Sequence, residues 1–377
     1  MHENCRPTWN ARRLMRLCLA ATALLTTAAA EAPVRYNLTA VDQELEKQCA
    51  EGLFAGVVVI RVRGKDIYER SCGMADIVNG IANSRQTRFK IYSTSKFITA
   101  LAVMRLVEQG KLSLDHPVST YVKDVPVEWS NVTIRQLLNH SSGIPDLTER
   151  LGERFTRDHP HAMRQLLADV SVDERAVKSP PGTTFAYNNF GFELLADAAS
   201  AATGMAFADL VAQQIFAPAA MTQASIENPY ILMGHPQPVN EPGLAFGYNG
   251  APGSLEQAVN YAFIQLGAGA VRATVDDFIA LDWALSAGKI VSRRSLEEMT
   301  RIPADRPESG VKFGLGVFVG EVSGVKMHGH TGGTNGYISD FERYTDDDAM
   351  LIALTNRGFA KTRWLREAVA KMLYEAR

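Results

Sequence analysis

The chain has 377 residues, of which 46% are hydrophobic and 21% are charged, and its formal net charge is -2. This is ordinary globular composition, and the length allows one large domain or two modest ones. The sequence contains no basic stripe with interleaved aromatic residues, which argues against nucleic acid as a partner.

The first 30 residues differ from the rest of the chain. A basic stretch, RRLMR, precedes the apolar run LCLAATALL and the small residues TTAAA. This order predicts a Sec-type signal peptide at 1–30, cleaved near Ala30, and so a secreted or periplasmic protein without a stable membrane span after cleavage. An amphipathic organelle presequence is the alternative. After export, Cys49 and Cys72 could form a disulfide, or they could remain two buried thiols.

The N-terminal half begins with a predicted helix over 41–54. Two strands joined at Gly64-Lys65 are expected to follow as a hairpin. A helix over 91–109 ends before Gly110, and a short helix begins the stretch TIRQLLNHSSGIPDL. Helical segments broken by loops are expected over 143–252, and an amphipathic helix over 275–288.

The C-terminal part returns to strands. The candidates are KFGLGVFVGEV, VKMHGHTGG, GYISDFERY and DAMLIALTNR, followed by a final helix in TRWLREAVAKMLYEA. Strands near both chain ends predict an α/β fold of the α+β type, with one antiparallel sheet flanked by helices and an inserted, mostly helical lobe. The expected sheet domain comprises 33–90 and 261–377, the helical domain is 91–260, and the site lies at their interface.

Ser93 and Lys96 lie in YSTSK, at the start of a long apolar stretch. Residues three apart share a helix face, so the two side chains are expected to meet. A serine hydroxyl needs a base to act as a nucleophile, and a lysine becomes one when burial lowers its pKa. The alternative is a purely structural role for the pair, in which the serine caps the helix and the lysine reaches toward solvent.

Two further motifs join this pair. FAYNNFGFELL contains Tyr187 and Asn189, and GHTGGTNGY contains His330, Thr331 and Gly332. Taken separately, each has a structural explanation as a core tyrosine, a helix cap or a turn residue.

Together the motifs resemble those of a known family of serine hydrolases, related to class C β-lactamases. The family includes penicillin-binding D-alanyl-D-alanine carboxypeptidases, esterases and amidohydrolases. The resemblance covers nearly the whole chain after residue 30, and implies a β-lactamase/transpeptidase-like fold. It also rests on the stretches GMAD, YSTSKFITALAVMRLVEQGKLSLDHPVSTYV, TIRQLLNHSSGIPD, GAGAVRATVDDFIAL, FGLGV and LIALTN.

The resemblance implies a role for each matched residue. Ser93 is the nucleophile that becomes acylated, and Lys96 takes or relays its proton. Tyr187 assists as a base and as the acid for the leaving group, whereas Asn189 binds Lys96 or the substrate. The motif His330-Thr331-Gly332 lines the cleft, and the backbone N–H groups of Ser93 and Gly333 form the oxyanion hole. A phenol would need adjacent cations such as Lys96 to act as a base near neutral pH.

His330 departs from the class C β-lactamase pattern, which has a lysine at this position. A histidine is mostly neutral above its reference pKa of about 6.5, so it attracts a substrate carboxylate less. We therefore expect an acyl-enzyme hydrolase of a small-molecule or peptide amide or ester. Carboxypeptidase or penicillin-binding activity and esterase activity stay open, with β-lactamase activity third. The alternative to an active hydrolase is a catalytically weak penicillin-binding or scaffold protein.

Other readings of the sequence are weaker. No cofactor is expected, and no zinc-binding spacing of Cys and His or HExxH motif occurs. An α/β-hydrolase is disfavoured because G-x-S-x-G is absent. His140 is interpreted as a packing residue near the cleft. Arg135 and Arg272 are candidates for holding a substrate carboxylate.

Overall fold

The structure is a computed structural model that describes residues 36–148, 167, 170–226, 241–258, 266–302 and 312–376. These residues belong to one compact unit, Tyr36–Arg377. The predicted signal peptide at 1–30 lies outside the described residues, as do parts of the region 143–252.

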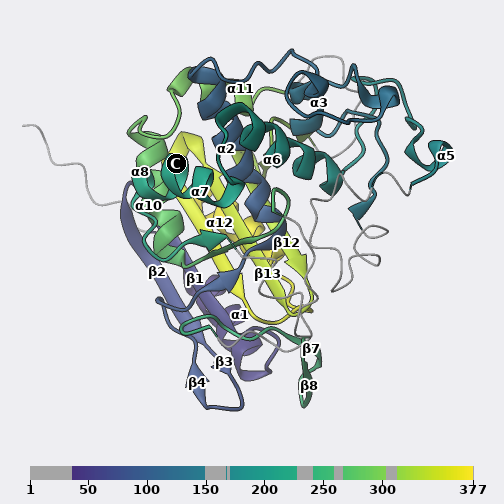
Figure 1. Cartoon of the computed structure of the whole chain (residues 1–377). Coiled ribbons are helices and arrows are strands. Elements are labelled where there is room, and N and C mark those ends of the chain that lie inside the picture. The colour runs from purple at the N-terminus through teal and green to yellow at the C-terminus, as the bar shows by residue number, and fades with distance from the viewer. Residues whose placement is uncertain are drawn as a thin grey trace, which may run out of the picture. The chain divides into compact units, whose positions relative to one another are not determined.

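A seven-stranded sheet organises this unit (Figure 1), with the strand order β10-β11-β12-β13-β14-β1-β2. Every neighbouring pair in it is antiparallel. The strands are β1 Gly56–Val62, β2 Lys65–Cys72, β10 Lys312–Phe313, β11 Phe318–Val322, β12 Val325–Thr334, β13 Tyr337–Tyr344 and β14 Ala349–Thr355. The prediction of one antiparallel sheet built from both chain ends is confirmed, because β1 pairs with β14 along its whole length.

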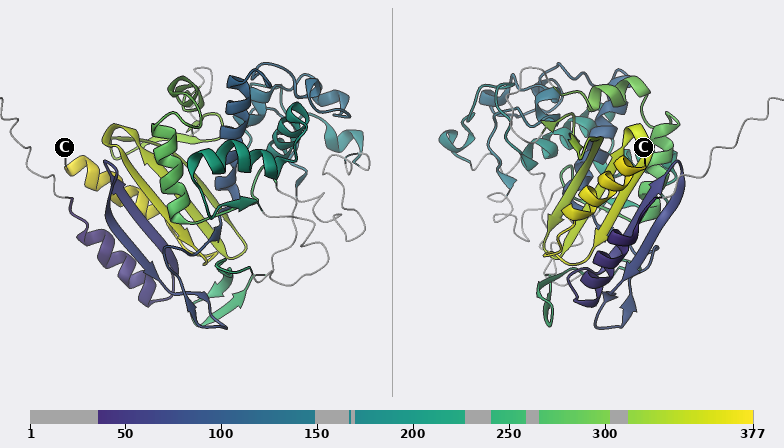
Figure 2. Two further views of the ribbon diagram at one scale, coloured as in Figure 1. Left: turned by 60° about the vertical axis from the view of Figure 1, so that its left-hand side comes forward. Right: turned by 180° about the vertical axis from the view of Figure 1, so that it is seen from behind.

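The apolar run in β1 is uninterrupted because helices cover both faces of the sheet (Figure 2). Val58 and Ile60 pack into a core with α1 (Thr39–Ala50) and α12 (Arg363–Glu375). Val57 and Val59 point to the opposite face and belong to the larger core, to which α2 (Ser95–Glu108) and α10 (Val275–Ser286) contribute. Side chains alternate across a strand, so one run of valines serves two cores.

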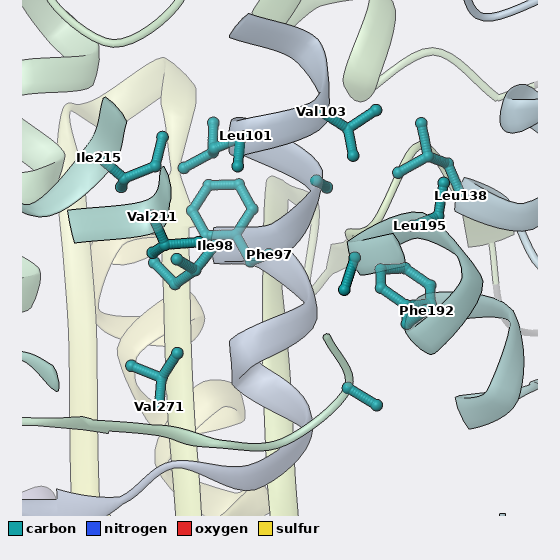
Figure 3. Packing of buried hydrophobic residues seen from close by; sticks show 14 of the residues in the cluster. Phe97, Ile98, Leu101, Val103, Leu138, Phe192, Leu195, Val211, Ile215 and Val271 are labelled. Carbon is teal, nitrogen blue, oxygen red and sulfur yellow. The ribbon is translucent and has the colours of Figure 1, made fainter. Parts of the chain in front are cut away.

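Helix α2 lies at the centre of the larger core. Its residues from Ser95 to Met104 are all buried, as expected of a helix with no solvent-facing stripe. Figure 3 shows Phe97 and Leu101 on the side of the helix that faces Val211 and Ile215, whereas Phe192 and Leu195 lie on its other side. Lys96 therefore enters the core with the helix that carries it.

The remaining elements are one further long helix and several shorter segments. The further helices are α3 Ile134–Leu138, α5 Val172–Arg175, α6 Asn189–Thr203, α7 Phe207–Val211, α8 Ala217–Ala219 and α11 Arg293–Met299. Short turns of other helix types are η1 Tyr92–Thr94, η2 Val118–Thr120, η3 Val127–Trp129, η5 Ala212–Phe216 and η6 Thr345–Asp347. The minor strands are β3 Met74–Asp76, β4 Ile81–Ala82, β5 Phe89–Lys90, β6 Ser225–Ile226, β7 Tyr248–Ala251, β8 Ser254–Gln257 and β9 Val271–Ala273. The division into domains at residues 90 and 260 stays a prediction.

Several predicted boundaries differ from the structure. The helix predicted over 41–54 is α1, which ends at Ala50, and the strand candidate KFGLGVFVGEV forms two strands, β10 and β11. The β1–β2 turn is formed by Arg63 and Gly64, not by Gly64 and Lys65. Both turn residues have positive φ, 48° and 74°, as the tight hairpin turn that matches the strand twist requires. The helix predicted over 91–109 begins as a 3-10 turn, Tyr92–Thr94, and becomes α-helical at Ser95.

Cys49 and Cys72 form a disulfide in the structure, with their Cα atoms 6.1 Å apart. The bond joins the end of α1 to the end of β2. Of the two alternatives for this pair, the structure therefore supports the disulfide.

No single helix in the described ranges is both long and apolar enough to cross a membrane. The segments Asn189–Thr203 and Phe207–Ala219 meet those criteria only as a pair, by length and composition, and the pair is bent by 80°.

Candidate active site

Ser93 lies in the 3-10 turn between β5 and α2, and that turn is held from two sides. The Oγ of Ser95 accepts a hydrogen bond from Val271 N at 3.1 Å, and the Oγ1 of Thr94 lies 2.8 Å from Ser339 Oγ. Thr94 and Ser95 are fully buried, whereas Ser93 is partly exposed. Tyr92 has a φ of 44°, which non-glycine residues rarely adopt and which often marks functional sites.

Lys96 is fully buried, and its Nζ lies within hydrogen-bonding distance of three acceptors. These are Ser93 Oγ at 3.1 Å, Asn189 Oδ1 at 2.7 Å and Ala268 O at 3.1 Å. They match the three protons of an ammonium group. Burial nevertheless lowers the pKa of Lys96 to about 7, against the opposing charges of two carboxylates. The amine is therefore partly neutral near pH 7 and can accept a proton.

Tyr187 brings a hydroxyl to the same place. Its hydroxyl is hydrogen-bonded to Ser93, and its ring centroid lies 4.9 Å from Lys96 Nζ. The side chain is 38% exposed, so a substrate can reach it. Burial of the rest of the group raises the pKa of Tyr187 to about 12. The phenol thus stays protonated at neutral pH, which disfavours the expected role as a base and leaves the role of proton donor.

Asn189 is oriented by a carboxylate that the sequence interpretation missed. Asp146 Oδ2 accepts hydrogen bonds from the backbone N of Asn189 at 2.8 Å and from its Nδ2 at 3.1 Å. The remaining amide oxygen of Asn189 faces Lys96. The N-cap of α6 is Asn188, whose Oδ1 accepts from Gly191 N, so Asn189 is not the helix cap. Asp146 lies in the matched stretch NHSSGIPD, but only the tertiary contact reveals its partner.

His140 is a packing residue beside the site, in agreement with its interpretation from sequence. It is buried, and its ring centroid lies 4.4 Å from that of Tyr187. Its Nδ1 accepts a hydrogen bond from the backbone N of Asn188 at 3.1 Å. The imidazole therefore supports the loop that presents Tyr187.

Strand β12 places the third motif along the Ser93 turn. His330 is fully buried, and its Nδ1 donates to the carbonyl oxygen of Thr331 at 2.6 Å. Burial, helped by the charge of Lys96, lowers the pKa of His330 to about 3, so the ring is neutral. A Cβ on Gly332 would lie 2.9 Å from Ser93 N, which shows how closely the strand approaches; Gly333 follows and is exposed.

A second carboxylate near Lys96 is that of Glu193, which lies on α6. It is buried, and its oxygens accept hydrogen bonds from Gly267 N at 3.3 Å and Ala268 N at 2.9 Å. Burial raises the pKa of Glu193 to about 8. A glutamate four residues after Asn189 in an apolar helix was the available sequence signal.

The two arginines considered for a substrate carboxylate are engaged elsewhere. Arg135 forms ion pairs with Asp115 and Glu298, and Arg272 forms one with Glu241. Among the described residues, no group of three or more His, Cys, Asp or Glu is placed to hold a metal ion.

The arrangement can perform nucleophilic chemistry on a carbonyl. A partly exposed hydroxyl lies beside a buried amine that can take its proton and beside a phenol that can give one. These are the elements that a serine hydrolase needs.

Comparison with known proteins gives the family. The β-lactamase family model matches residues 41–373. A penicillin-binding protein of Bacillus subtilis (strain 168) is 28% identical over 317 residues, which cover 81% of this chain and 68% of that protein. The crystal structure of a penicillin-binding protein from Bacillus halodurans aligns with a TM-score of 0.73 and 26% identity, covering 87% of this chain and 98% of the other.

A D-amino acid amidase from Ochrobactrum anthropi SV3, solved with L-phenylalanine amide, is also similar. Its TM-score is 0.70 and its identity 25%, over 89% of this chain and 97% of the other. The chain belongs to the β-lactamase family and is a serine hydrolase of that family.

Proposed function

We propose that the protein is an exported hydrolase that forms an acyl-enzyme on Ser93 with a small amide or ester. The observation that carries this proposal is the contact of 3.1 Å between the buried Nζ of Lys96 and the Ser93 hydroxyl. Near pH 7 the neutral amine takes the hydroxyl proton while Oγ bonds to the substrate carbonyl carbon. The negative charge then develops on the carbonyl oxygen, for which the N–H groups of Ser93 and Gly333 are the proposed donors.

Tyr187 completes the proton path. Its protonated phenol gives a proton to the leaving amine or alcohol as the carbon–nitrogen or carbon–oxygen bond breaks, and Lys96 returns the proton to the phenol. The net transfer is one proton from Ser93 to the leaving group. Water then cleaves the acyl ester, releases the acid and restores the serine.

The neutral state of His330 favours substrates without an obligatory carboxylate at that position. A lysine there would supply a permanent charge, whereas burial keeps this imidazole uncharged. The similarity to a D-amino acid amidase supports amino-acid amides as one substrate class. The ring centroid of half-buried Phe318 lies 4.8 Å from that of His330, so the neutral imidazole has an apolar neighbour. Amidase or esterase activity is therefore proposed ahead of carboxypeptidase and β-lactamase activity.

Export is proposed from the signal-like segment at 1–30. The disulfide between Cys49 and Cys72 supports it, because such bonds persist in oxidising compartments.

The test combines turnover with covalent labelling. Wild type is incubated with D-phenylalanine amide, D-alanine amide, p-nitrophenyl acetate and a penicillin, and both product and intact-protein mass are followed. We expect turnover of at least one amide or ester and a mass gain equal to the acyl group. Ser93→Ala should abolish both, whereas Ser254→Ala, at an exposed serine, should change neither. Absence of turnover and of any adduct in wild type would contradict the proposal.

An adduct that forms quickly but is not released would favour the other candidate. The protein would then be a penicillin-binding or sensor protein with slow deacylation, and burst kinetics followed by a flat phase would show it.

A further inference from the structure

Glu193 occupies a position where an ionisable group is costly. It lies on α6, whose neighbouring residues Phe190, Phe192, Leu194 and Leu195 are all buried in the larger core. The carboxylate itself is only 5% exposed. Burying an ionisable group without partners is unfavourable, so the contacts of this group must explain its presence.

Those contacts form a short chain that ends at Lys96. The carboxylate accepts the N–H groups of Gly267 and Ala268, and the carbonyl oxygen of Ala268 accepts a hydrogen bond from Lys96 Nζ. The same loop is held from α2, where Thr99 Oγ1 donates to Gly267 O at 2.6 Å. Lys96 and Thr99 lie three residues apart on α2 and contact the Gly267–Ala268 segment from one side, and Glu193 on α6 contacts it from the other.

The segment cannot relax easily. A Cβ on Gly267 would lie 2.0 Å from the carbonyl oxygen of Phe192, so the backbone is pressed against α6. Only a carboxylate offers two acceptor oxygens to two adjacent N–H groups, since an amide would turn its NH₂ toward one of them. The geometry therefore selects glutamate over glutamine at this position.

We propose that Glu193 is a positioning residue for Lys96: it holds the N–H groups of Gly267 and Ala268 and so fixes the Ala268 carbonyl against the amine. This inference rests on the proposed acylation of Ser93. It assigns a role to a residue that the family resemblance left without one. Glu193 contacts neither Ser93 nor the reacting atoms, so it acts through the loop.

Several charged or titratable groups besides Glu193 act on this pair and remain in all variants below. Asp146 raises the pKa of Lys96, whereas Asp197 acts on Glu193 from one turn further along α6. His330 and Tyr187 lie beside Lys96 from β12 and from the loop before α6.

The variant Glu193→Gln replaces one acceptor oxygen by an NH₂ group and changes the charge near pH 7 little, because the pKa of Glu193 is about 8. We therefore expect the midpoint of the pH-dependent rise in acylation to stay near that of wild type. We also expect the plateau rate to fall about tenfold, because the displaced loop no longer holds the amine in place. Acylation is measured before the steady state as intact-protein mass gain from p-nitrophenyl acetate between pH 5 and 9.

Thr99→Val is the matched control. It releases the same loop from α2 without changing a charge, so we expect a lower plateau rate and an unmoved midpoint. Glu298→Gln removes a carboxylate that pairs with Arg135, and should leave both the rate and the midpoint unchanged.

The outcomes separate this inference from the proposed function. If wild type is not acylated, the proposed function fails. If wild type is acylated and folded Glu193→Gln keeps the wild-type plateau rate, the positioning role is wrong and the residue is structural. Should Glu193→Gln not fold, Glu193→Asp keeps the carboxyl group but is one methylene too short to hold both N–H groups. Its acylation should then be slower with an unmoved midpoint, and a wild-type rate in folded Glu193→Asp would overturn the inference.

Discussion

At the scale of single residues, burial changes what Lys96 and Tyr187 can do. In water the amine would be charged at neutral pH, but desolvation lowers its pKa to about 7. The same effect raises the pKa of Tyr187 to about 12. We therefore propose separate roles for the two groups at neutral pH, with the amine as proton acceptor and the phenol as proton donor. Acylation should rise with pH as the amine loses its proton, with a midpoint near 7.

Replacing Tyr187 by Phe tests this separation. The variant lacks the proton donor, so we expect the acylation rate with an amide substrate to fall about 100-fold or more. The midpoint of the pH profile should stay in place, because the phenol does not titrate between pH 5 and 9. Tyr374→Phe, at an exposed tyrosine, serves as the control with wild-type kinetics. A midpoint that moves in Tyr187→Phe would show that the phenol, and not the amine, titrates in this range.

At the scale of elements, the site depends on how closely β12 approaches the turn before α2. A Cβ on Gly332 would lie 2.1 Å from the carbonyl oxygen of Ile91 and 2.9 Å from Ser93 N. Backbone atoms cannot yield locally, so any side chain there must push the strand and the turn apart.

Gly332→Ala should therefore reduce kcat/KM by about 100-fold, because a displacement of about 1 Å in reacting groups has that effect. Gly320→Ala on β11 is the matched control, since its Cβ would meet only Met327 Sδ at 3.9 Å. Both variants are compared by circular dichroism and by steady-state kinetics. A folded Gly332→Ala protein with wild-type kcat/KM would be incompatible with the tight packing of β12 against the turn.

At the scale of the whole molecule, the disulfide closes the N-terminal part of the fold. Cys49 and Cys72 are 23 residues apart, and their bond ties α1 to the edge strand β2. A crosslink that closes a loop of this length lowers the entropy of the unfolded chain. This raises the free energy of unfolding by about 3 kcal/mol.

The double variant Cys49→Ser/Cys72→Ser should lower the free energy of unfolding in urea by about that amount. Dithiothreitol should destabilise wild type similarly and leave the double variant unaffected. Because the bond lies away from Ser93 in the chain and in the sheet order, kcat should change little at 25 °C. Equal stability of oxidised and reduced wild type would mean that the two cysteines do not form a stabilising bond.

Much of this molecule could be predicted from the sequence, for reasons that differ by feature. The alternation of strands and helices follows from local patterns, so the sheet built from both chain ends could be inferred. Ser93, Lys96, Tyr187 and His330 could be named because they lie in short motifs. The contacts of Asp146 and Glu193 could not be predicted, because they join α6 to residues that are 43 and 75 positions away in the chain. The raised pKa of Tyr187 likewise depends on burial, which a motif does not encode.

The central claim is that the amine of Lys96 is neutral enough at physiological pH to take the proton of Ser93. Titration of the Lys96 ¹³Cε resonance, in protein labelled on lysine and assigned with Lys96→Arg, tests this directly. We predict a midpoint near pH 7. A Lys96 midpoint near 10.5, the ordinary value for the group, would contradict the account.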